Sequence, residues 1–152
     1  LASAMEEAFQ TARETGIQFV GPWVLSSLAL VSDDPERRRQ ALTDAEELFQ
    51  AGSVGHNLAI YPDAIEISLA DAEWDEVERY CTALADYTRQ EPLPFTDFLI
   101  AYGRTLAAFG RGQRDEADIA EIERLRDEAT RVGLKRAMPR LDQALAEVTS
   151  SA

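Results

Sequence analysis

The sequence is poor in the residues that build most metal and catalytic sites. It contains one cysteine, Cys81, one histidine, His56, and one lysine, Lys135, among 152 residues. A single cysteine cannot form an internal disulfide bond, which is typical of a reducing compartment, and we expect a cytoplasmic protein. One histidine without a second histidine or cysteine does not supply the usual ligands of a zinc site. We therefore predict no metal site, no cofactor and no catalytic residue.

Glycine and proline are also scarce, with 8 and 6 residues respectively. Their scarcity leaves long uninterrupted segments, which favours helices over a β fold with many turns. The sequence has neither an apolar run of the roughly 18–20 residues that span a bilayer nor the pattern of a signal peptide at its start. Leu1 is not an initiator methionine, and the first residues have the pattern of the second half of a helix. We therefore interpret the chain as a fragment of a longer one.

Basic residues are outnumbered by acidic ones, 15 to 28, and the net charge is −13. A surface of this sign disfavours nucleic acids and anionic membranes, so we predict neither as a partner. The acidity is concentrated in residues 1–110, whose net charge is −12, whereas residues 111–152 have a net charge of −1. We interpret it first as a solvated surface that keeps helices soluble, with a specific basic partner as the alternative.

A period of 39 residues organises the chain. A column of large apolar residues lies beside a column of small ones, as close helix packing requires. The large column is Leu28, Ile67, Leu106 and Leu145, and the small column is Ala29, Ser68, Ala107 and Ala146. Two further columns are Gly16, Gly55, Pro94 and Gly133, and Ala12, Ala51, Gln90 and Ala129.

The period predicts an all-α fold, an α-α superhelix of stacked helix hairpins in a single helical-repeat domain over residues 1–152. A partial helix at 2–14 precedes three units, and a helix at 134–148 caps the stack. The units, each with its two helices, are 16–54 (17–31 and 35–51), 55–93 (57–70 and 74–89) and 94–132 (95–109 and 114–131). That makes about eight helices, counted on this repeat pattern.

Local chemistry explains these boundaries. Asp34-Pro35 suits a helix start, Glu91-Pro92-Leu93-Pro94 prevents helix continuation, and Gly110-Arg111-Gly112 separates two helices. Glycines at the predicted C-terminal turns, Gly16, Gly52 and Gly133, suit a positive φ. Pro22, Pro62 and Pro139 fall at matching or adjacent places; either the helices begin there or their first turns are loosely wound, and we favour the second.

The pattern resembles the tetratricopeptide class, through Tyr61 early in one helix, Ala72 at the turn and Trp74 at the start of the next helix. The usual period of that class is about 34 residues, so this chain departs from its consensus. Resemblance to this class implies a superhelix with a concave side that binds extended peptides or partner helices.

A second resemblance covers most of the chain. It is similar to the C-terminal repeat region of bacterial class III adenylate/guanylate cyclases, in which a cyclase domain and a signal-transduction ATPase precede helical repeats. The matching stretches are 16–23, 33–38, 54–57, 61–66, 91–94 and 103–104. The resemblance implies a noncatalytic regulatory scaffold that binds its own upstream domains or a peptide or helix of another protein. The alternative is a purely structural module that packs against those upstream domains.

The candidate binding residues are Trp23, Ser27, Glu66 and Thr105. Ser27, Glu66 and Thr105 form a polar column between apolar ones, which indicates a solvent-facing groove. Trp23 is interpreted either as a core residue or as a contact residue of a binding surface, where tryptophan is enriched. The run 37–39 of three arginines is expected to pair with acidic residues of neighbouring helices, or to take part in an interdomain contact.

Overall fold

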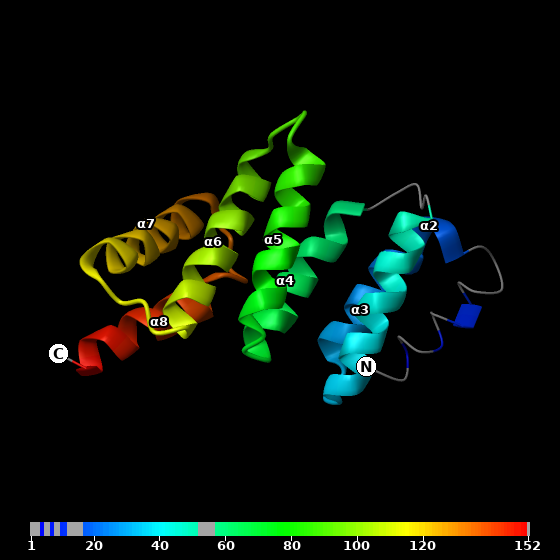
Figure 1. Ribbon diagram of the computed structural model, residues 1–152, viewed down its shortest axis with the longest axis horizontal. Helices are drawn as coiled ribbons and strands as arrows, with labels where there is room; N and C mark the ends of the chain where they lie inside the picture. Colours follow the sequence, from blue (N-terminus) through cyan, green and yellow to red (C-terminus); the bar gives the residue numbers. More distant parts are fainter. Residues whose placement is uncertain (1–3, 5–6, 8–9, 12–16, 52–56, 152) are drawn as a thin grey trace. The chain divides into compact units, whose positions relative to one another are not determined.

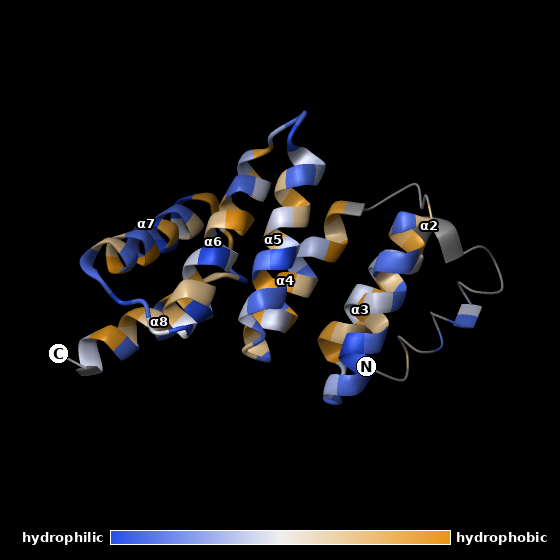
Figure 2. Ribbon diagram, viewed as in Figure 1, coloured by the Kyte–Doolittle hydropathy of each residue, from blue (hydrophilic) through white to orange (hydrophobic). Residues whose placement is uncertain are grey.

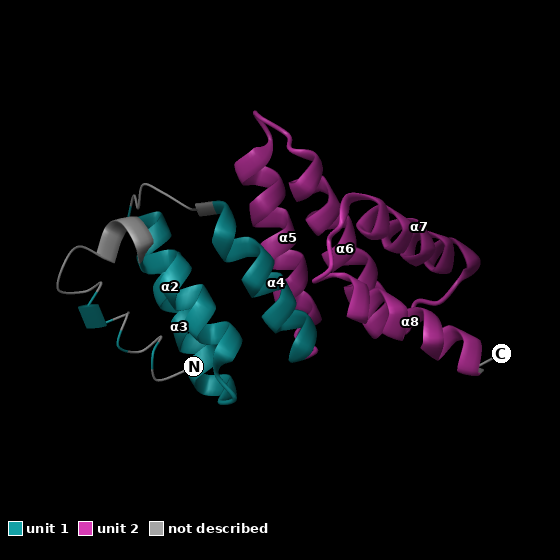
Figure 3. Ribbon diagram, turned by 180° about the vertical axis from the view of Figure 1, so that it is seen from behind, with its two compact units in different colours: residues 1–71 teal, residues 72–152 magenta. Residues whose placement is uncertain are grey.

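The computed structural model describes residues 17–51 and 57–151, with the separate positions 4, 7, 10 and 11 (Figure 1). Every regular element in these ranges is a helix, so the prediction of an all-α fold is confirmed for the described part of the chain. The chain divides into two compact units, residues 1–71 and 72–152, which are described separately below (Figure 3). Their boundary lies between the two helices of the predicted unit 55–93.

Unit 1 contains the α-helices α2 (Ile17–Val31), α3 (Pro35–Gln50) and α4 (Ile60–Ala70), and the short 3-10 helix η1 (Asn57–Ala59). Helix α2 packs against both α3 and α4. The packing buries apolar side chains from all three α-helices. Its core consists of Leu25, Leu28, Ala29, Ala41, Leu42, Ala45, Ile60, Tyr61, Ala64, Ile65, Ile67 and Leu69.

Unit 2 contains α5 (Trp74–Thr88), α6 (Pro94–Gly110), α7 (Glu116–Val132) and α8 (Met138–Ser151). Each helix packs against the next, and α6 also contacts α8. The largest fully buried side chains of the unit are Val77, Cys81, Leu84, Thr96, Tyr102, Ile122, Leu125 and Leu141. Loop 111–115 between α6 and α7 is largely hydrophilic (Figure 2).

The helix boundaries agree closely with the local signals. Asp34 caps α3 and accepts a hydrogen bond from the backbone N of Glu36 at 2.9 Å, while Pro35 occupies the first turn. Helix α7 begins later than the predicted residue 114, because Asp115 and Asp118 form a capping box. Gly133, with φ of 80°, ends α7 as predicted.

The three prolines behave differently from one another. Pro22 lies inside α2. Pro62 comes shortly after the 3-10 helix η1, and this turn is the loosely wound helix start that we favour. Pro139 is the second residue of α8, so there the alternative holds and the helix begins at the proline. The predicted capping helix 134–148 is therefore shifted to Met138–Ser151. Residues 134–137 form a turn instead, in which the Lys135 N donates to the Gly133 carbonyl.

Two of the predicted columns mark buried positions through the first three units. Leu28, Ile67 and Leu106 are 9%, 6% and 7% exposed, and the small residues beside them are buried as well. In α8 the same columns are more open, since Leu145 is half-buried and Ala146 is exposed. The column of Ala51, Gln90 and Ala129 is buried only at Ala129 among its described members. Ala12, Gly16, Gly52, Gly55 and His56 and most of the predicted helix 2–14 lie outside the described residues.

Candidate binding surface

An apolar stripe on α2 is exposed. Trp23 is 50% exposed, Leu30 is 40% exposed, and Ser27 between them is half-buried. The three residues are spaced i, i+4 and i+7, which places them on one side of a helix. Helix α2 has no charged residue along its 15 positions, so this side offers apolar surface without a charged fringe of its own. The structure thus places Trp23 at the surface and not in the core.

A buried polar contact holds α2 against α4 beside the exposed pair, since Ser26 comes three residues after Trp23 and four before Leu30. The Ser26 hydroxyl lies 2.9 Å from Asp63 Oδ2 and 3.0 Å from the Trp23 carbonyl oxygen. Its single proton is therefore shared between an acceptor on α4 and one on its own helix. Ser26 is 0% exposed and Asp63 is 7% exposed, so the contact is shielded from water. Buried polar groups that keep a hydrogen bond stabilise a specific packing arrangement, and this one joins α2 to α4.

Glu66 lies one turn after Asp63 on α4 and is half-buried. It therefore belongs to the same unit as Trp23 and Ser27, on a helix that packs against theirs. Thr105 lies on α6 in unit 2 and is also half-buried. The structure assigns three of the four predicted residues to unit 1, and the common groove remains a prediction.

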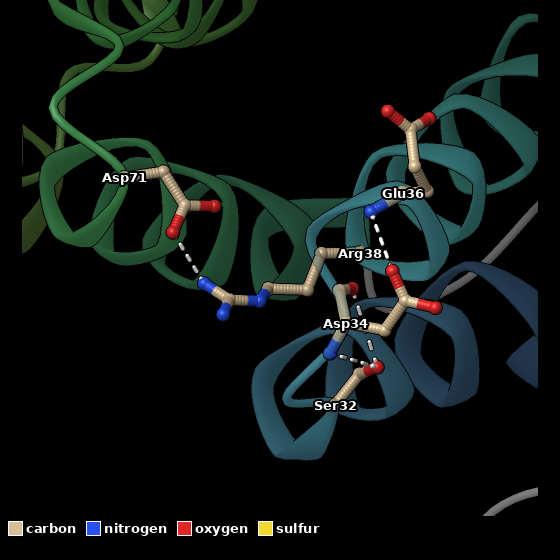
Figure 4. A network of polar contacts seen from close by, with 5 residues as sticks. All are labelled: Ser32, Asp34, Glu36, Arg38 and Asp71. Carbon is tan, nitrogen blue, oxygen red and sulfur yellow. Dashed lines mark hydrogen bonds and ion pairs between the residues drawn. The ribbon is translucent and has the colours of Figure 1, made fainter.

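Arg38 of the arginine run joins α3 to the end of α4 (Figure 4). Its guanidinium lies 2.5 Å from Asp71 Oδ1, and the two side chains are only 19% and 23% exposed. Arg39 pairs with Glu36 on its own helix at 2.8 Å. The first interpretation of the run, pairing with an acidic residue of a neighbouring helix, is confirmed for Arg38. Asp71 is the last residue of unit 1, so this ion pair fixes α3 to the point where the unit ends.

The surface of unit 2 is dominated by ion pairs between helices. Arg104 on α6 binds Glu78 on α5 at 2.9 Å, and its guanidinium also donates to Thr82. Arg111 reaches Asp75 at 2.5 Å, and Arg126 on α7 reaches Asp142 on α8 at 2.7 Å. A fourth such pair joins Arg114 to Glu147 at 3.4 Å. These groups satisfy one another, which makes them poor candidates for binding an external charge.

Unit 2 has its own exposed apolar side chains at the turn between α5 and α6. Tyr87, Leu93 and Phe95 are 47%, 37% and 48% exposed. The apolar spacing of α5 predicts that Tyr87 is buried with Val77 and Leu84, and for Tyr87 this prediction is wrong. Tyr87 lies in the last turn of α5, next to the proline-containing turn that ends the helix pair. The turn 89–93 that follows is mostly polar, and its one large apolar residue, Leu93, is itself exposed.

The single thiol is suited to packing and not to chemistry. Cys81 is 0% exposed, and burial raises the pKa of its thiol to about 12, with a further contribution from the carboxylate of Glu78. A thiol that stays protonated is a weak nucleophile and a weak metal ligand. Among the described residues, no three or more histidine, cysteine, aspartate or glutamate side chains are grouped to hold a metal ion. Within the same residues, no helix combines the length and apolar character needed to cross a membrane.

Sequence reasoning identified Trp23 and Ser27 but missed Leu30 and the contact between Ser26 and Asp63. The signal for Leu30 was present, since it lies seven residues after Trp23 on an uncharged helix. The Ser26–Asp63 contact has no signal at the level of spacing, because its partners are 37 residues apart. Comparison of the chain with protein-family models, curated proteins and solved structures finds no match.

Proposed function

We propose that this chain is a noncatalytic scaffold for protein–protein interaction, built as a tetratricopeptide-like superhelix of stacked helix hairpins. The observation that carries the proposal is the exposed stripe of α2, where Trp23 is 50% exposed and Leu30 is 40% exposed on a helix without charges. Exposed tryptophan is enriched at the centres of protein interfaces. Burying this stripe removes apolar area from water at about 25 cal/mol per Å², which favours association.

The scaffold belongs, in this proposal, to a cytoplasmic bacterial cyclic-nucleotide signalling protein of the adenylate/guanylate cyclase type. The residue stretches described above support this assignment through their similarity to the repeat region of such cyclases. The repeats then transmit the binding of a protein partner to the cyclase domain. Two buried columns at the 39-residue spacing support the repeat architecture.

The test is nucleotide cyclase activity of the complete protein that carries these residues. The variant Trp23→Asp/Leu30→Asp places charge on the stripe, and we expect the rate or its regulation to change by about fivefold or more, the usual range of coupling between sites. The matched control is Tyr87→Asp/Phe95→Asp, which changes side chains of similar exposure in unit 2. An equal response to both variants, or to neither, contradicts the proposal. A complete protein without cyclase activity removes the cyclase assignment and leaves the scaffold to be tested by binding.

A second candidate is a structural module that packs against its own upstream domains and binds nothing else. The observation that favours it is the same exposed pair, Trp23 and Leu30, because an apolar surface can be covered by another domain of the same protein. The two candidates differ in their partner. If the upstream domains, prepared separately, bind residues 1–152 and lose binding with Trp23→Asp/Leu30→Asp, the structural candidate is supported. If they do not bind, it is excluded.

A further inference from the structure

One buried hydroxyl on α2 lies within hydrogen-bond distance of two acceptors. The Oγ of Ser26 is 2.9 Å from Oδ2 of Asp63 on α4 and 3.0 Å from the backbone carbonyl oxygen of Trp23. A serine hydroxyl carries one proton, and neither a carboxylate nor a carbonyl oxygen donates one. The two acceptors therefore compete for the same proton. Because Ser26 is 0% exposed and Asp63 is 7% exposed, water has little access to replace the donor that one of them lacks.

The competition bears on the turn of α2 that presents Trp23. Pro22 lies inside α2, and proline has no backbone N–H, so the helix lacks one hydrogen bond at that residue. A serine side chain that bonds a carbonyl oxygen one turn earlier in a helix bends the helix. The strength of the bond from Ser26 to the Trp23 carbonyl therefore affects the local course of α2, and Trp23 is 50% exposed at this place.

The other acceptor belongs to a different helix. Asp63 lies in the first turn of α4, where the N-terminal end of a helix favours a negative charge. A change in α4 that brings the carboxylate closer to Ser26 draws the hydroxyl proton away from the Trp23 carbonyl, and a change that moves it away has the reverse effect. The bond to Asp63 alone would join α2 to α4, and the second contact extends that link to the exposed residue.

We propose that Ser26 is a positioning residue, which couples α4 to the exposed Trp23 by dividing one proton between Asp63 and the Trp23 carbonyl. The inference rests on the proposed function, in which Trp23 contacts the partner, and adds to it a way for binding at α2 to act on α4. A partner that holds Trp23 in one position favours one of the two directions of the hydroxyl proton. By linkage the coupling is reciprocal, so a change at Asp63 alters binding at Trp23 to the same extent.

NMR of the complete, isotope-labelled 152-residue chain tests the coupling at the Trp23 carbonyl carbon, whose resonance depends on the hydrogen bonds that its oxygen accepts. Asp63→Asn supplies an amide N–H that donates to Ser26, so the hydroxyl proton turns to the Trp23 carbonyl and the resonance should move downfield. Ser26→Ala removes the donor, and the resonance should move in the opposite direction. Ser27→Ala, at the neighbouring half-buried position, is the matched control and should leave it unchanged.

The double variant Ser26→Ala/Asp63→Asn separates the coupling from a simple loss of charge. We expect the effect of Asp63→Asn on Trp23 to disappear in this background, because no hydroxyl is left to respond. Circular dichroism verifies that the variants keep their helix content, and Ser26→Cys, a weaker donor, replaces Ser26→Ala if the latter does not fold. An effect that persists without the hydroxyl overturns the inference, as does a Trp23 resonance that neither single variant moves.

The NMR experiment needs no partner, so its result is separate from the test of the proposed function. Cyclase activity that ignores Trp23→Asp/Leu30→Asp removes the proposed function and leaves the coupling in place. A cyclase response to that variant, together with a Trp23 resonance that ignores Asp63→Asn, removes the coupling and leaves the proposed function in place.

Discussion

The two units differ in how far ion pairs join their helices, since unit 1 has the pair Arg38–Asp71 and unit 2 has several. Unit 2 joins its helices with arginine–carboxylate pairs, such as Arg104–Glu78 and Arg126–Asp142. In unit 1, α2 and α4 have no basic residue, and their contact depends on apolar packing and the buried Ser26–Asp63 hydrogen bond. Charges that pair with one another are less available to a partner, whereas the uncharged helix α2 exposes apolar area at Trp23 and Leu30.

The largest expected difference between the units is in thiol reactivity. Cys81 in unit 2 is buried with a thiol pKa of about 12, so its thiolate fraction near pH 8 is on the order of a thousandfold below that of an ordinary cysteine. A cysteine placed on the open stripe, as Leu30→Cys with Cys81→Ala, should react like a free thiol. Iodoacetamide labelling followed by mass spectrometry measures both rates. Similar rates for the two cysteines would show that the stripe is covered or that unit 2 opens readily.

Gly110, at the end of the α5–α6 pair, has no room for a side chain. A Cβ atom at Gly110 would lie 2.5 Å from Cη2 of the Trp74 ring, so we expect Gly110→Ala to destabilise the unit by about 1–3 kcal/mol. Urea unfolding followed by circular dichroism measures the loss. In the background of Trp74→Leu, which removes the ring, the cost should shrink. An unchanged cost in that background would assign the effect to the backbone and not to the ring.

Removing the buried hydrogen bond of unit 1 should have a slightly smaller effect. Ser26→Ala leaves Asp63 in a buried site without that donor, and we expect a loss of about 1–2 kcal/mol in the free energy of unfolding. Urea unfolding measures it. Ser27→Ala, at the neighbouring half-buried position, is the control and should change stability by less than about 0.5 kcal/mol. Equal losses for the two variants would argue that the Ser26–Asp63 contact does not stabilise the packing of α2 on α4.

Replacing Ala72, the first residue after unit 1, with glycine should stabilise the protein. Ala72 has φ of 56°, a left-handed conformation that costs a residue with a Cβ about 1 kcal/mol. Ala72→Gly is therefore expected to raise the thermal midpoint, as measured by circular dichroism. The control Ala70→Gly, at the last position of α4, should lower it, because glycine is unfavourable within a helix. A decrease for both variants would contradict the left-handed conformation of Ala72.

The smallest effect concerns the paired surface of unit 2 in acid. A hydrogen bond from Arg124 lowers the pKa of the Glu121 carboxyl. A carboxyl with a lowered pKa in the folded state contributes stability at neutral pH, and this is lost as pH falls through that pKa. Both side chains are more than one-third exposed, at 37% and 51%, so the contribution is about 0.3–0.5 kcal/mol. An NMR titration should show the pKa of Glu121 rising with Arg124→Gln; an unchanged pKa would exclude the pair as its cause.

The sequence by itself determined where helices begin and end, because those signals act within a few residues. Asp34-Pro35 starts α3 and Gly133 ends α7 through hydrogen bonds and backbone angles that involve only their neighbours. It also determined the buried columns of Leu28 and Ala29, since a period of 39 residues returns them to the same face. Only the tertiary structure decided that Leu30 is open while Leu69 is buried, and that Tyr87 and Trp23 are exposed. Burial depends on whether a neighbouring helix covers a given face, and spacing along one helix does not say where that neighbour lies.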